Sequence, residues 1–419
     1  MRLPRTFLAS ALTATLVGPL LAGPLLAGPA DAALPRQIDY QQWDSPAQLR
    51  TGTLSGLRLA KGKLRIGTPV GTTKYAGRTY GYGRWTSTWA RPGFGLTELV
   101  PSWNATTRGD SWVRVDVRGR SEDGRRSSWD TLAHWASGDS TIRRTSLGEQ
   151  ADDLARVAVD TWRSNFSLEL KSWQIRLTLF RKAGTKATPF VDSVGAMSSN
   201  LPQTDRVTTS RPGVASGLPA LDVPKYSQMI HTGDYPQYGN GGEAWCSPTS
   251  TSMVLGYYDR LPSSAEYAWV RTPHRNRYVD HAARMTYDYA YRGTGNWPFN
   301  TAYAGNHADH AFVTRLRNLR QAERFIEAGI PVVTSIAFGR GELDGAPISA
   351  TDGHLVVVVG FTETGDVVVN DPAARHNRGV RRTYDRGQFE NAWLPKSGGL
   401  VYVIRNGDHP LPANSPGNW

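Results

Sequence analysis

The chain has a single cysteine among its 419 residues, Cys246, and the surroundings of this cysteine suit a nucleophile. A glycine-rich stretch, Gly241-Gly242-Glu243-Ala244-Trp245, leads into it, and the residues that follow predict a helix. The N-terminus of a helix favours a thiolate, because free backbone N–H groups and the helix dipole stabilise negative charge. A buried cysteine that acts only as a small hydrophobic residue is the competing interpretation.

A histidine and an aspartate stand on two runs of sequence that predict neighbouring strands. His354 lies near the start of an apolar run that ends at Phe361, and after a short turn a second run leads from Asp366 to Asp371. The next residue is a proline, which cannot donate to a ladder and therefore ends the second strand. If Phe361 pairs with Asp366, His354 lies diagonal to Asp371 on the same face. A thiolate, an imidazole base and an orienting carboxylate form a complete nucleophilic triad. Capping of the turn before the proline is the competing role for Asp371.

These residues resemble papain-like cysteine peptidases of the bacteriocin-leader-processing kind, the peptidase C39-like family. The matching motifs are Val223-Pro224-Lys225-Tyr226-Ser227-Gln228, Cys246-Ser247-Pro248-Thr249-Ser250, Gly353-His354 and Asn370-Asp371-Pro372. They indicate a domain over about residues 221 to 405, under half of the chain. The resemblance implies an α+β papain-like catalytic domain in which Cys246 attacks, His354 transfers protons and Asp371 orients the histidine.

The chain departs from this family at Ser247, where the family usually has glycine. Serine is a good N-cap and Pro248 then falls at the first helical position, so we expect a helix from Pro248 to about Arg260. An acyl-transfer enzyme also needs donors for the oxyanion, supplied here by the backbone N–H of Cys246 and a side-chain amide. Gln228 is the amide that the resemblance implies, and Asn240, nearer in sequence, is the alternative.

The length of the chain predicts two domains. Residues 34–197 contain short alternating runs, such as 112–118 and 172–179, which predict an all-β sandwich or jelly-roll domain. Residues 198–220 concentrate Ser, Thr, Gly and Pro and predict a linker. We expect the catalytic domain over residues 221–406.

Within the expected catalytic domain, residues 267–303 predict irregular structure, and a helix is expected near residues 321–328. A helix first and a sheet later give an α+β domain with the site in a cleft between them. Residues 407–419 are expected to form a tail.

The N-terminus predicts a Sec-type signal peptide over residues 1–32. Arg2 and Arg5 precede an apolar run to about Ala27, and Ala30-Asp31-Ala32 is a small-x-small cleavage site. We therefore expect the mature protein to be secreted and extracellular, with no membrane span after cleavage.

The formal net charge is +12, yet the basic residues are scattered through both halves. Denser clusters at 271–277 and 375–382 suit an anionic cell-wall polymer, and the tryptophan-rich N-terminal domain suits carbohydrate. No nucleic-acid-binding motif accompanies the charge, so we expect no nucleic-acid partner. His307-Ala308-Asp309-His310 and the pair His274 and His281 lack zinc-site spacing, and no metal or other cofactor is expected.

The sequence thus predicts a secreted thiol hydrolase, a cysteine peptidase that acts on peptides or proteins through an acyl-enzyme. One alternative is an amidase or acyl transferase on cell-wall peptides. Another is a cell-surface binding protein with a papain-like scaffold, which loss of a triad member would favour.

Overall fold

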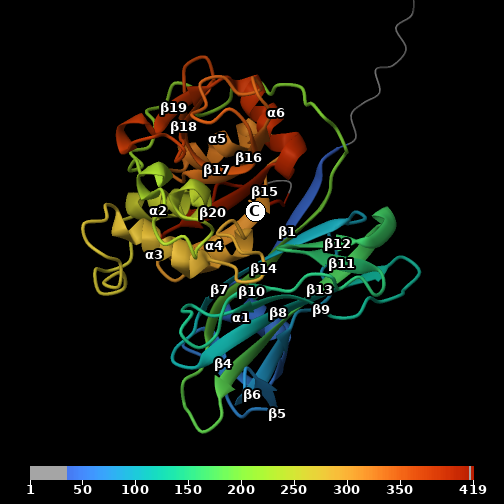
Figure 1. The fold of residues 1–419 in the computed structure, drawn as a ribbon. Coiled ribbons are helices and arrows are strands. Elements are labelled where there is room, and N and C mark those ends of the chain that lie inside the picture. Colours follow the sequence, from blue (N-terminus) through green and yellow to red (C-terminus); the bar gives the residue numbers. More distant parts are fainter. Residues whose placement is uncertain (1–34, 415–416) are drawn as a thin grey trace, which may run out of the picture. The chain divides into compact units, whose positions relative to one another are not determined.

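The computed structural model describes residues 35–414 and 417–419 (Figure 1). The expected signal peptide lies outside the described residues. Residues Pro35–Trp419 form one compact unit. Among the described helices, none combines the length and the apolar character that crossing a bilayer requires.

The first half of the unit consists of two antiparallel sheets. One has the order β11 (Ala155–Ala158), β12 (Thr161–Ser164), β7 (Glu98–Thr106), β14 (Phe190–Asn200), β4 (Lys63–Ile66), β3 (Leu57–Ala60), and β1 (Gln37–Trp43) pairs with β14. The other has the order β10 (Thr145–Ser146), β9 (Asp130–Trp135), β8 (Ser111–Ser121), β13 (Leu170–Lys182), β6 (Arg78–Thr86), β2 (Thr53–Ser55), and β5 (Gly71–Tyr75) pairs with β6. Two short helical elements accompany them, α1 (Pro46–Thr51) and η1 (Asn165–Ser167).

The two sheets share one hydrophobic core, because apolar residues alternate along their strands. Trp103 and Trp162 enter this core from the first sheet, and Trp85, Trp135 and Trp173 enter it from the second. Each of these side chains is less than 2% exposed, so core packing explains them. The runs expected at 112–118 and 172–179 lie in β8 and β13, as the alternation predicts.

The second half is built around a third antiparallel sheet. Its order is β15 (His310–Arg315), β20 (Leu400–Arg405), β16 (Val332–Phe338), β17 (Thr351–Phe361), β18 (Val367–Asn370), β19 (Arg381–Tyr384). Its helices are α2 (Cys246–Tyr257), α3 (Arg277–Thr286), α4 (Trp297–Ala304), α5 (Leu319–Glu327) and α6 (Arg386–Ser397). Three short turns of 3-10 helix are η2 (Gln228–His231), η3 (Gly242–Ala244) and η4 (Asn377–Gly379).

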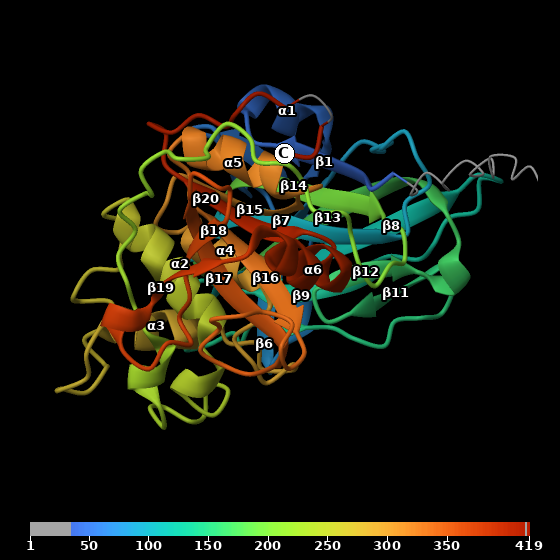
Figure 2. The same cartoon turned by 90° about the horizontal axis from the view of Figure 1, so that it is seen from above.

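Helices cover both faces of this third sheet (Figure 2). Val357 and Val359 of β17 pack with α2, α3 and α4, whereas Val356 and Val358 pack with α5 and α6. Because successive side chains of a strand point to opposite faces, a continuous apolar run becomes a strand buried on both sides. The molecule is therefore mostly antiparallel sheet with few helices, a β domain followed by a sheet that carries helices.

Residues 267–303, expected to be irregular, contain α3 and α4, so that expectation was wrong. In α3, Val279, Ala282 and Ala283 recur at helical spacing and are buried. The N-cap of α4 is Asn296, whose side chain accepts the Phe299 N–H at 3.1 Å. Both helices are short, with 10 and 8 residues, so each offers only about two to three turns of pattern in the sequence.

The two halves are joined by side chains that hydrogen-bond to an edge strand. Asn104 on β7 accepts the Ala311 N–H at 2.9 Å and donates to the Ala311 carbonyl at 2.6 Å. Ser102 accepts the Val313 N–H at 2.8 Å. Since β15 is the edge of its sheet, β7 satisfies backbone groups that would otherwise be exposed.

The segment expected to be the linker, residues 198–220, completes β14 and then runs along the second half. Ser210 donates through its N–H and hydroxyl to the Glu390 carboxylate, each at 2.6 Å. The Ala215 N–H donates to Glu323 at 3.2 Å, and Ala215 is fully buried. This segment is therefore held in place by buried carboxylates, and the division into domains stays a prediction.

Candidate active site

Cys246 is the first residue of α2, and Trp245 is its N-cap. The helix therefore begins two residues earlier than expected from Pro248, and it ends at Tyr257 instead of about Arg260. The reason is that η3 leads directly into α2, and the Ser247 hydroxyl lies 2.9 Å from the Tyr402 hydroxyl instead of capping the helix. At the first helical position the backbone N–H of Cys246 has no partner within the helix, so it is available to an anion.

His354 and Asp371 form a buried pair. His354 is 3% exposed and Asp371 is 0% exposed. Nε2 of the ring lies 2.8 Å from Oδ1 of the carboxylate. Ser250 of α2 donates to the Leu355 carbonyl at 2.9 Å, which fixes the cysteine helix to the strand beside His354.

Two further groups hold the Asp371 carboxylate. The Tyr384 hydroxyl donates to Oδ2 at 2.6 Å, and the Ala373 N–H donates to Oδ1 at 2.9 Å. Tyr384 lies on β19 and is fully buried. Sequence reasoning missed this tyrosine, because only the pairing of β18 with β19 brings it to Asp371.

The electrostatics of the pair favour a protonated histidine. Burial by itself lowers the pKa of His354, but the Asp371 carboxylate and the hydrogen-bonded Cys246 thiol raise it to about 10. Burial by itself raises the pKa of Asp371, but the His354 ring and the Tyr384 hydroxyl bring it below its ordinary value. At neutral pH the site is therefore arranged for an imidazolium at His354 beside the Asp371 carboxylate.

Asn370 connects the Asn-Asp-Pro motif to the motif that begins at Val223. Its carboxamide donates to the carbonyls of Val223 and Pro224, both at 3.1 Å. The Gln228 N–H in turn donates to the Pro372 carbonyl at 2.9 Å. The segment that carries Gln228 is therefore fixed to the strand end that carries Asp371.

Both candidates for the oxyanion hole line the same cleft as Cys246 and His354. Gln228 is 3% exposed, and its Nε2 donates to the Glu243 carbonyl at 2.7 Å. Asn240 is exposed and adopts the left-handed conformation, with φ of 72°. The structure brings both residues near Cys246.

The cleft has a volume of about 880 Å³, at the large end of the range for ligand pockets. Gly293, Gly295 and Trp297 line it. The first half of the chain also contributes, through the turn and strand of the β11–β12 hairpin, residues 158–163. Sequence reasoning missed this wall, because no motif in the hairpin indicates it.

Two of the other histidines named from the sequence, His281 and His310, have side-chain hydrogen-bond partners. His281 accepts from the Trp269 indole N–H at 3.2 Å, and His310 lies 3.2 Å from the Gln42 carboxamide. Burial, the largest cause in each case, lowers the pKa of both to about 4. His274 instead contacts Asp234 and Asp280.

Comparison with solved structures gives only remote similarity. The structure of the infectious bursal disease virus Gt strain has 10% identity and a TM-score of 0.20, and the match covers 43% of this chain and 36% of that chain. The structure of the Gx strain of the same virus has 9% identity and a TM-score of 0.19, and the match covers 43% of this chain and 37% of that chain. Endo-1,4-beta-D-xylanase 10B of Clostridium thermocellum was solved as its CBM22-1-GH10 modules with xylohexaose. It has 10% identity and a TM-score of 0.17, and the match covers 48% of this chain and 31% of that chain. The chain thus spans about a third of the length of these proteins, and such TM-scores support no argument.

Two family models match the sequence, although no curated protein does. Residues 220–400 match the Peptidase C39 like family, and residues 39–199 match the Peptidase C39 N-terminal domain. The second half of the chain, which carries Cys246, therefore contains a domain of the peptidase C39-like family, and the first half contains a peptidase C39 N-terminal domain.

Proposed function

We propose that the chain is a cysteine peptidase that uses Cys246 as nucleophile, His354 as proton carrier and Asp371 as the group that orients His354. The observation that carries this proposal is the buried His354–Asp371 pair beside a thiol at a helix N-terminus, in one large cleft. The helix-and-sheet arrangement supports a papain-like catalytic domain.

In the first half of the reaction, the Cys246 thiolate attacks the carbonyl carbon of the scissile peptide bond. A C–S bond forms and the carbonyl oxygen becomes an oxyanion. The imidazolium of His354 then donates its proton to the amide nitrogen as the C–N bond breaks, which releases the amine and leaves a thioester.

In the second half, neutral His354 accepts a proton from water while the water oxygen attacks the thioester. The C–S bond breaks, the acid product leaves, and the thiolate–imidazolium pair is restored. Because Nε2 faces Asp371, we assign both proton transfers to Nδ1.

For the oxyanion we propose the Cys246 N–H and the side chain of Gln228. One N–H of the Gln228 carboxamide is used by Glu243, which fixes the group, and the second N–H remains for the substrate. Asn240 is the weaker candidate, because its exposed side chain is not held by a hydrogen bond among the described residues.

We further propose that the β11–β12 hairpin forms part of the substrate-binding wall. Asp160 in its turn accepts the Trp297 N–H at 3.0 Å, which joins the hairpin to α4 at the cleft. Arg163 lines the cleft from the adjoining strand. Substrate binding would then depend on both halves of the chain.

The test is profiling of the purified chain against peptide libraries and peptidoglycan fragments, with Cys246→Ala and His354→Ala as the inactive variants. His409→Ala is a matched control for His354→Ala, since His409 does not line the cleft. We expect hydrolysis by the wild type and by His409→Ala, and none by Cys246→Ala. Activity that persists in Cys246→Ala would refute the proposal, and cleavage confined to peptidoglycan fragments would favour the amidase alternative.

A further inference from the structure

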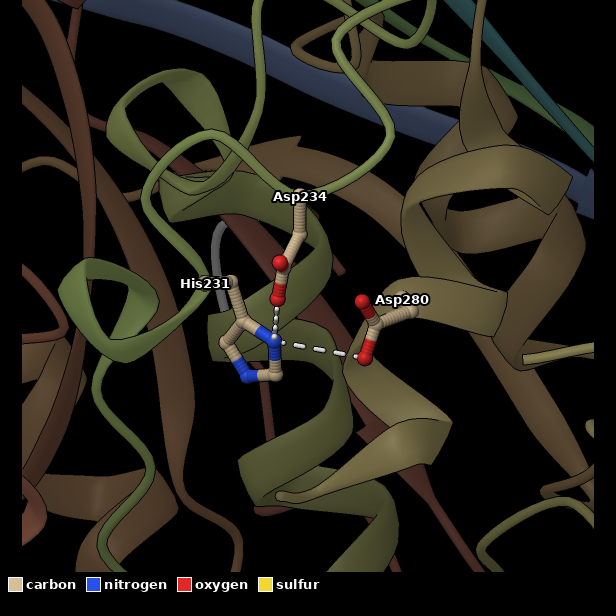
Figure 3. Close-up of side chains that lie close together, drawn as sticks. All are labelled: His231, Asp234 and Asp280. Carbon is tan, nitrogen blue, oxygen red and sulfur yellow. Dashed lines mark ion pairs between the residues drawn. The ribbon is translucent and has the colours of Figure 1, made fainter. Parts of the chain in front are cut away.

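A second cluster of ionisable side chains lies away from Cys246, around His231 (Figure 3). His231 ends η2, Asp234 follows in the next turn, and Asp280 lies in the first turn of α3. Nδ1 of His231 is 3.2 Å from Oδ2 of Asp280 and 3.6 Å from Oδ2 of Asp234. These three side chains, which we call the His231 cluster, point toward one another from three separate segments of the chain.

Two members of the cluster are buried and carry polar atoms without a hydrogen-bond partner among the described residues. His231 is 1% exposed, and neither of its ring nitrogens has a partner among the described residues. Asp280 is 0% exposed, and its Oδ2 has none either within residues 35–414 and 417–419. The two atoms are 3.2 Å apart, but the direction of the ring N–H does not suit a hydrogen bond between them. Since buried polar groups are nearly always satisfied, this pair indicates a further ligand.

The separations in the cluster match those of ligands around one small cation. Donor atoms at about 2.0–2.1 Å from a tetrahedral zinc ion are about 3.3 Å from one another. The observed separations from Nδ1 are 3.2 Å and 3.6 Å. Imidazole with carboxylates suits zinc and related transition metals, whereas calcium and magnesium prefer all-oxygen sites.

We propose that the His231 cluster is a binding site for a zinc-class divalent transition-metal ion. His231 contributes Nδ1, and Asp234 and Asp280 each contribute one carboxylate oxygen. Asp234 also lines a small surface pocket together with His274, so one side of the cluster is next to solvent.

His274 supports both carboxylates from outside the cluster. Its Nδ1 lies 3.1 Å from Oδ2 of Asp234 and 3.2 Å from Oδ1 of Asp280. Groups in this second layer orient ligands and typically change metal affinity by about 10- to 100-fold.

The site bears on catalysis through Gln228, a consequence that rests on the proposed function. His231 lies three residues after Gln228 in the same turn, and the Gly233 N–H donates to the Glu243 carboxylate at 3.3 Å. Next to Glu243, a Cβ at Gly242 would lie 2.2 Å from the Gln228 carbonyl oxygen. A metal ion in the cluster therefore fixes the turn that carries Gln228 against the loop that leads to Cys246.

The test uses the full chain without an affinity tag, stripped with a chelator and then loaded with zinc chloride. Bound metal is measured by mass spectrometry after desalting, and the thermal midpoint is measured with and without zinc. Asp234→Asn and Asp280→Asn remove one ligand each. Glu266→Gln is the matched control, because Glu266 is a carboxylate near His281 and His307 but outside the cluster.

We expect one zinc ion per chain and a higher thermal midpoint in the wild type and in Glu266→Gln. Zinc affinity should fall at least tenfold in both aspartate variants, and calcium should not substitute. Absence of bound zinc in the wild type, or equal zinc binding by Asp234→Asn, would overturn the proposal. Asp234 is partly exposed, so its variant keeps the test valid if Asp280→Asn does not fold. Zinc binding without peptide hydrolysis would leave the metal site standing and count only against the proposed function.

Discussion

Replacement of Asp371 by asparagine should lower the pH at which His354 loses its proton. The pKa of His354 is raised from 6.5 to about 10, against the effect of burial, by the Asp371 carboxylate and the Cys246 thiol. An opposite charge at hydrogen-bond distance typically changes a pKa by about 1–3 units. In Asp371→Asn the ring should therefore deprotonate about 1 to 3 pH units lower, while the shape of the side chain is preserved.

The directions of the two pKa shifts determine how the stability of the folded chain depends on pH. A raised histidine pKa means that the charged ring stabilises the folded chain fully below about 6.5, and that this contribution is lost as the pH rises through about 10. The lowered pKa of Asp371 contributes stability above its ordinary value of 3.8, which is lost as the pH falls through the lowered value. The ion pair is thus intact across neutral pH.

The assay is a titration of the histidine rings by nuclear magnetic resonance, with His354 assigned from the spectrum of His354→Gln. Tyr384→Phe is the control, since it removes a hydrogen bond to Asp371 but leaves the charge. We expect the control to titrate near the wild-type value of about 10, and Asp371→Asn to titrate about 1 to 3 pH units lower. The reasoning is refuted if Asp371→Asn, shown to be folded by circular dichroism, titrates at the same pH as the wild type.

Three further outcomes are expected. Iodoacetamide should alkylate the single cysteine rapidly at pH 7, and measured rates should fall in His354→Ala; equal rates in both would contradict an activated thiol. Turnover should vanish in Cys246→Ala, and the double variant of Cys246 and His354 should be scarcely worse, whereas Asp371→Ala should keep a measurable remainder in initial-rate assays. A fragment of residues 221–419 exposes the edge of β15 and lacks the hairpin at the cleft. Its thermal midpoint and its activity should therefore both be lower than those of the full chain. Full activity of the fragment would exclude a role for the hairpin.

The sequence was most informative where chemistry and local pattern coincide. The lone cysteine, the glycine–histidine pair and the Asn-Asp-Pro stretch predict which side chains lie together. In the structure Cys246 and His354 line one cleft, and the buried Asp371 lies 2.8 Å from His354. Cys246 begins α2 and Asp371 directly follows β18, so at these two residues a short local pattern predicts where the helix begins and where the strand ends. The roles of these residues remain predictions that the variants above test.

Features that depend on distant segments could not be predicted in this way. Tyr384 reaches Asp371 through strand pairing, and the β11–β12 hairpin reaches the cleft from the first half of the chain. The residues of the His231 cluster come from a turn, a loop and a helix, so they show none of the spacings by which zinc sites are recognised. In each case the information lies in the tertiary arrangement.

The hairpin of β17 and β18 shows how a correct conclusion can follow from a wrong register. Phe361 pairs with Val367, and not with Asp366 as expected, which by itself would place His354 and Asp371 on opposite faces. The ladder shifts by one residue between Val358 and Gly360, so that Val357 pairs with Asn370. A β-bulge adds one residue to one strand, and beyond it the side chains return to the register that puts the histidine and the carboxylate on one face. The bulge, four residues from the site along β17, is therefore as necessary to the pair as the two residues themselves.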